Sequence, residues 1–94
     1  MLKRIKDNEE KLNKLIKVIK QLECALDNFE DIQEDIKAVN KYYGSKNWFR
    51  DKELFEKGEI KNIKAGVLSE DAVWNANENI KELIERMENI AKRV

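Results

Sequence analysis

Two stretches of this chain decide the fold: YYGSKNW at residues 42–48 and GVLSEDAVW at residues 66–74. Each places a helix stop next to a helix start, with aromatic side chains beside both signals. Gly44 can adopt the left-handed conformation that ends a helix, and Ser45 can accept a hydrogen bond from a free N–H of the next helix. Because the remaining sequence is glycine-poor and proline-free, these stretches predict where the helices end and begin.

Before the first stretch, apolar residues repeat every seven positions in two rows that form an apolar seam. The first row is Ile5, Leu12, Ile19 and Leu26, and the second row is Leu15, Leu22, Phe29, Ile36 and Tyr43. This 3–4 alternation predicts one long helix over about residues 2–43. The stripe is narrow up to Leu12 and gains a third row from Val18 onward. We therefore expect the wide half to lie inside a bundle and the narrow half to contact a single partner helix.

The start of the last helix has several independent signals. Ser69 can cap it, and Glu70 and Asp71 would then lie in its first turn, where the helix dipole favours negative charge. Leu68 and Val73 occupy the positions of a hydrophobic staple across that cap. The sequence therefore predicts a helix over about residues 70–93.

Between the two stretches, we expect a short helix over about residues 46–57 that ends at Gly58. Together with the long first helix, these segments predict an all-α fold of three helices in a single domain spanning residues 1–94. We expect antiparallel, bundle-like packing, with the last helix along the wide half of the first.

Composition excludes several classes of protein. The formal net charge is zero, with 19 basic and 19 acidic residues, so we expect no nucleic-acid partner. No apolar run is long enough to span a membrane, and the polar N-terminus does not resemble a signal peptide. The single cysteine, Cys24, cannot form an internal disulfide. We expect a cytoplasmic protein without a membrane partner.

The absence of histidine excludes histidine-based catalytic triads and the common zinc ligand sets, so we expect no metal and no cofactor. Cys24 falls on a solvent-facing row and has no histidine to activate it. Carboxylates at Asp51, Glu70 and Asp71, with Ser69, could bind a hard cation or act as acid and base. The alternative, which we favour, is that these side chains cap helices and form ion pairs.

The two stretches and Asp51, three residues after the first, contain a candidate cluster for a ligand site or a structural corner. Its members are Tyr43, Ser45, Trp48, Asp51, Ser69, Glu70, Asp71 and Trp74. Aromatic residues line many ligand pockets, but they also fill the corner where a short helix crosses longer ones. We favour the corner, and expect Trp48 and Trp74 to be buried and Tyr43 and Asp51 to lie near the start of the last helix. One stretch would supply hydrogen-bond donors and the other acceptors.

Charge is segregated along the first helix. Residues 1–20 carry seven basic and three acidic side chains, a balance of +4, whereas residues 23–35 carry six acidic and no basic side chains. Antiparallel pairing with a second copy would place basic halves on acidic halves, with Ile5, Leu12 and Leu15 in the interface. The expected partner is a homodimer mate or another helical protein; the alternative is a solvated helix whose charge pattern has no function.

The segments YYGSKNWFRD (42–51) and KAGVLSEDAVW (64–74) also resemble the two signatures of a family of short bacterial proteins, known as domain of unknown function 4298. The matching residues are Tyr43, Gly44, Ser45, Trp48 and Asp51, followed by Gly66, Val67, Leu68, Ser69, Glu70 and Asp71. The resemblance implies a relationship over essentially the whole chain. It implies no activity, and this chain lacks the proline that relatives carry between the two blocks.

These patterns predict a non-enzymatic interaction or structural module that self-associates through its first helix. One alternative is a protein that binds a small ligand or a cation in a cleft between residues 43–51 and 66–74. A further alternative is an enzyme that uses the carboxylates of Asp51, Glu70 and Asp71.

Overall fold

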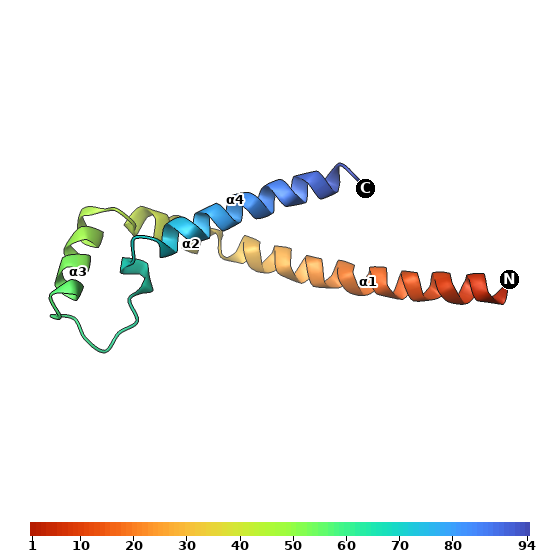
Figure 1. The fold of residues 1–94 in the computed structure, drawn as a ribbon, viewed down its shortest axis with the longest axis horizontal. Coiled ribbons are helices and arrows are strands. Elements are labelled where there is room, and N and C mark those ends of the chain that lie inside the picture. Colours follow the sequence, from red (N-terminus) through yellow and green to blue (C-terminus); the bar gives the residue numbers. More distant parts are fainter. The chain divides into compact units, whose positions relative to one another are not determined.

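The computed structural model describes residues 1–94 and contains helices but no strand, which confirms the predicted all-α class (Figure 1). The elements in chain order are α1 (Leu2–Asp31), α2 (Gln33–Tyr42), α3 (Lys46–Glu56), the short 3-10 helix η1 (Gly66–Leu68) and α4 (Ala72–Ala91). There are therefore four α-helices, and the predicted number of three is wrong.

The difference arises at Ile32, where the predicted helix over residues 2–43 divides into α1 and α2. Ile32 has φ −95° and ψ 7°, well away from the helical ψ near −42°. The side-chain amide of Gln33 donates to the carbonyl oxygen of Phe29 at 2.9 Å, the acceptor that the N–H of residue 33 uses in a regular helix. The second row of the seven-residue repeat continues across this point from Phe29 to Ile36, so the pattern did not reveal the interruption.

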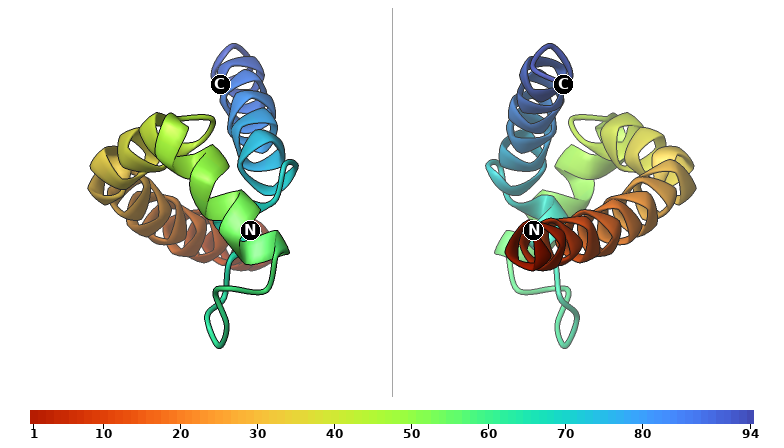
Figure 2. Two further views of the ribbon diagram at one scale, coloured as in Figure 1. Left: turned by 90° about the vertical axis from the view of Figure 1, so that its left-hand side faces the viewer. Right: turned by 90° about the vertical axis from the view of Figure 1, so that its right-hand side faces the viewer.

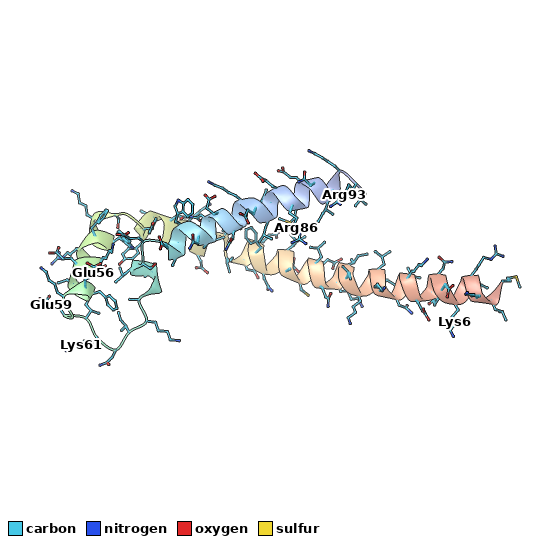
Figure 3. All side chains as sticks on the ribbon, viewed as in Figure 1. Lys6, Glu56, Glu59, Lys61, Arg86 and Arg93 are labelled. Atoms are coloured by element: carbon cyan, nitrogen blue, oxygen red, sulfur yellow. The ribbon has the colours of Figure 1, made fainter.

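The chain consists of two compact units, residues 1–35 and residues 36–94. The first unit contains α1 and the first residues of α2. None of the residues of α1 is buried, and its side chains project above and below the ribbon in Figure 3, where Lys6 marks the N-terminal part. The seam is exposed as well: Leu15 retains 55% of its accessible surface and Leu22 52%.

The second unit contains the rest of α2, together with α3, η1 and α4. Its buried apolar residues are Trp48, Leu68 and Val73, and η1 contacts both α3 and α4. Leu68 and Val73, the predicted staple pair, are thus two of the three buried residues. This small core lies where the stretches at residues 42–48 and 66–74 meet.

The predicted stop and start after α2 are present. Gly44 has φ +78°, in the left-handed region that ends helices. The hydroxyl oxygen of Ser45 then accepts a hydrogen bond from the backbone N–H of Trp48 at 3.2 Å. This cap fixes the start of α3 at Lys46, as the sequence predicted.

The end of α3 has the geometry of a Schellman motif. Gly58 has φ +77°, and its N–H donates to the carbonyl of Phe55 at 3.0 Å. The N–H of Glu59 donates to the carbonyl of Leu54 at 3.1 Å, which completes the pair of bonds typical of this motif. The connection over residues 57–65 then leaves the end of α3 and returns to η1, as both views of Figure 2 show.

The start of α4 is two residues later than predicted. The hydroxyl oxygen of Ser69 accepts hydrogen bonds from the backbone N–H groups of Asp71 and Ala72, each at 3.1 Å. Ser69 therefore satisfies free N–H groups as expected, but the regular helix begins only at Ala72. Glu70 and Asp71 consequently precede α4.

Candidate functional site

Trp48 is the centre of the candidate site. Its side chain is 4% exposed, and the indole Nε1–H donates to the backbone carbonyl of Val67 at 2.8 Å. Val67 lies in η1, whereas Trp48 lies in the first turn of α3. A buried indole needs an acceptor for its N–H, and this carbonyl satisfies that need while it joins α3 to η1.

Tyr43 packs against Trp48 and reaches the second stretch. The two rings form an edge-to-face pair with centroids 5.1 Å apart and an interplanar angle of 73°. The phenol of Tyr43 donates to the backbone carbonyl of Glu70 at 2.5 Å. Both side-chain donors come from the first stretch and both carbonyl acceptors from the second, which confirms the predicted division of roles.

Lys52 adds an ion pair that the sequence had not indicated. Its Nζ lies 2.5 Å from Oε1 of Glu70 and 5.2 Å from the centroid of the Trp48 ring. The hydrogen bond to the Glu70 carboxylate raises the pKa of Lys52, and the same bond lowers the pKa of Glu70. Lys52 follows Trp48 by four residues and therefore shares its helix face, but that spacing alone does not identify a partner 18 residues away.

Asp51 forms a hydrogen bond with a residue of the first stretch. Its Oδ2 accepts a hydrogen bond from the phenol of Tyr42 at 2.6 Å. This bond, which favours the protonated phenol, raises the pKa of Tyr42. The residue of α3 that pairs with Glu70 is Lys52, one position further on.

A pair of amides joins α2 to α4. Nδ2 of Asn77 donates to Oδ1 of Asn40 at 2.8 Å, and Nδ2 of Asn40 donates to Oδ1 of Asn77 at 3.4 Å. This pair was not predictable from the sequence, because asparagine is common on helix surfaces and the two residues are 37 positions apart.

Trp74 does not join the cluster. It is 58% exposed, so the prediction that it is buried is wrong. Its neighbour Val73 is the buried residue of this turn, and successive residues of a helix point about 100° apart. Phe49 is likewise 61% exposed, although its ring contacts Trp48 edge-on at 4.9 Å.

The polar side chains of Ser45, Asp51, Ser69 and Glu70 all form internal bonds. Ser45 and Ser69 accept from backbone N–H groups, Glu70 pairs with Lys52, and Asp51 accepts from Tyr42. Nowhere do three or more cysteine, aspartate or glutamate side chains gather in a way that could hold a metal ion. Chemically, the arrangement is a set of internal bonds that joins α2, α3, η1 and the start of α4. Cys24 is a free, exposed thiol on α1.

Comparison with known proteins assigns the family. The model of the family described as a domain of unknown function (DUF4298) matches residues 5–90. The chain belongs to the DUF4298 family. The match spans both compact units and contains both signature stretches, so the family assignment covers the seam of α1 as well as the cluster around Trp48. No curated protein and no solved structure is a significant match. None of the helices is both long and apolar enough to cross a membrane.

Proposed function

We propose that this DUF4298 chain is a non-enzymatic interaction or structural module that self-associates through α1. The observation that carries the proposal is the exposed seam of α1, a helix that buries none of its residues. The exposed apolar side chains on this helix are Leu2, Ile5, Leu12, Leu15, Ile16, Val18, Ile19, Leu22 and Leu26. Contiguous apolar surface of this kind is typical of a protein–protein contact.

Helix length supports an intermolecular partner. At the standard rise, the 30 residues of α1 extend about 45 Å, whereas the 20 residues of α4 extend about 30 Å. Even complete overlap with α4 would therefore leave at least about three turns of α1 without cover. A second copy offers a helix of matching length.

Charge favours an antiparallel arrangement of the two copies. Residues 1–20 have a net charge of +4, whereas residues 23–35 carry six acidic side chains and no basic one. In an antiparallel pair, the basic segment of each copy lies beside the acidic segment of the other. A parallel pair would align like charges along the whole interface.

The cluster around Trp48 supports a structural role more than ligand binding. The donors on Tyr43, Trp48 and Lys52 already have acceptors on Val67 and Glu70. A ligand at this position would have to displace those internal bonds. We therefore assign the cluster to holding the second unit together.

Substitution of the seam tests the proposal. In sedimentation velocity, the double variant Ile5→Asp with Leu12→Asp should be monomeric at concentrations where the wild type is dimeric, because burying a carboxylate in an apolar interface is strongly unfavourable. The control variant Asn13→Asp with Gln21→Asp adds the same charge to the same helix outside the seam rows, and should still dimerise. Equal behaviour of the two variants contradicts assignment of the interface to the seam.

A further inference from the structure

We propose a specific register for this self-association: the α1 helices of two copies pair antiparallel about a two-fold axis that passes between Lys20 and Gln21. Ile19 of one copy then lies opposite Leu22 of the other. This inference rests on the proposed function and adds to it the alignment of the two chains.

Polar residues interrupt the seam at two positions. Asn8 and Gln33 stand where the seven-residue repeat would place an apolar residue. Their side-chain amides donate to backbone carbonyls of the preceding turn, at 2.7 Å and 2.9 Å respectively. Between them the seam is apolar without interruption. The uninterrupted part consists of Leu12, Leu15, Ile19, Leu22, Leu26 and Phe29. Its midpoint falls between residues 20 and 21, which is also the midpoint between Asn8 and Gln33.

The two rows of the seam also fit together in this register. In an antiparallel pair, each first-row residue packs beside a second-row residue of the other helix. With the axis between residues 20 and 21, two residues face each other across the pair when their numbers add up to 41. Each such facing pair forms one layer of the interface, and every layer between Asn8 and Gln33 is apolar. The layers are Leu12 with Phe29, Leu15 with Leu26, and Ile19 with Leu22, each formed twice.

Neighbouring registers place a polar amide in the apolar interface. Moving one helix by seven residues in one direction brings Asn8 beside Leu26, and moving it in the other direction brings Gln33 beside Leu15. A polar side chain buried without a partner from the other helix is unfavourable. In the proposed register Asn8 and Gln33 lie at the same level, at the two ends of the apolar layers.

Charge supports the same register independently of the apolar pattern. Residues 11–20 carry four lysines and no acidic residue, whereas residues 21–30 carry three acidic residues and no basic one. An axis between residues 20 and 21 lays each of these segments on the other. Moving the axis to Lys17, as the register that brings Asn8 beside Leu26 requires, would instead lay lysines on lysines over residues 14–20.

Cysteine cross-linking tests the register. The chain has one natural cysteine, so Cys24→Ser gives a thiol-free background. Val18 and Ala25 each immediately precede a first-row residue of the seam. In the proposed register, Val18 of one copy and Ala25 of the other lie on the same side of the interface, about two residues apart along the helix axis. The two Val18 positions, in contrast, are five residues, or about 7.5 Å, out of alignment. Two chains are needed, one with Val18→Cys and one with Ala25→Cys, and one of them carries a tag so that mixed dimers can be recognised.

Mild oxidation of the mixture should give a disulfide-linked dimer of one chain of each kind, and Val18→Cys alone should remain unlinked. Cross-linking of Val18→Cys with itself overturns the register, because it requires the axis near residue 17. Dimers in sedimentation without either cross-link also overturn the register but leave self-association intact. A thiol-free background that stays monomeric at all concentrations overturns both the register and the proposed function.

Discussion

The phenol oxygen of Tyr43 lies 2.5 Å from the backbone carbonyl oxygen of Glu70. The residue that precedes the helix stop at Gly44 is therefore bonded to the residue that follows the cap at Ser69. Together with the Trp48–Val67 bond at 2.8 Å, this contact brings the stretches at residues 42–48 and 66–74 into one structural unit.

Replacing Trp48 with Ala should lower the free energy of unfolding by about 3–5 kcal/mol, the range for large aromatic residues removed from a core. Trp74→Ala is the matched control, because Trp74 is 58% exposed, and its effect should stay within about 1 kcal/mol. Urea denaturation measures both. A loss below about 1 kcal/mol for Trp48→Ala would mean that the indole is a surface residue available for binding.

Tyr43→Phe removes the hydroxyl but keeps the ring against Trp48. We expect a loss of about 0.5–1.5 kcal/mol in the free energy of unfolding, the net contribution of one hydrogen bond. Hydrogen exchange should show where the loss acts, with faster exchange of the amides around Ser69 and the start of α4. An unchanged exchange pattern there would indicate that the bond to Glu70 does not hold this segment.

The Lys52–Glu70 pair makes stability depend on pH in a defined way. The pKa of Glu70 is lowered, so its contribution is present above its unfolded pKa of about 4.3 and is lost as pH falls through the folded pKa. The pKa of Lys52 is raised, so the contribution is present below about pH 10.4 and is lost as pH rises through the folded pKa. Between these limits the pair stabilises the fold.

Glu70→Gln should therefore reduce the denaturation midpoint most at neutral pH, and its difference from wild type should close toward acidic and alkaline pH. Glu82→Gln, which removes one carboxylate from α4, is the control and should differ little from wild type at any pH. Urea midpoints measured from pH 3 to pH 11 give the comparison. A Glu70→Gln difference that is constant over this range contradicts the ion pair.

Gly44→Ala tests the helix stop. Gly44 has φ +78°, and an added Cβ would meet no atom within 4 Å, so the change acts through backbone conformation alone. We expect a loss of about 1–2 kcal/mol. Gly66→Ala also meets no atom within 4 Å and lacks the positive φ, so thermal denaturation should show it to be neutral or more stable by about 0.4–1 kcal/mol. Equal effects of the two substitutions would contradict the assigned stop.

Helix ends were predictable from sequence wherever their cause is local. Gly44 and Ser45 determine the boundary between α2 and α3 through φ preference and one side-chain bond, and Gly58 does the same for the end of α3. The interruption at Ile32 was not predictable, because a seven-residue repeat records side-chain position and not the dihedral angles of one residue.

The candidate cluster was predictable in part for the same reason. Tyr43 and Trp48 carry donors that need partners once buried, so their bonds to the second stretch followed from their chemistry. Lys52 was missed because any surface lysine resembles it in sequence. Trp74 was misplaced because aromatic character does not tell which of two adjacent residues faces the core.

Sedimentation of the wild-type chain over a concentration series, from below to well above micromolar, tests self-association most directly. The account predicts a shift from the monomer mass of 11.1 kDa to twice that mass as concentration rises. It also predicts weaker association at high salt, which screens the opposed charges, with some affinity retained by the apolar seam. A mass that stays at 11.1 kDa at every concentration and in every salt would contradict it.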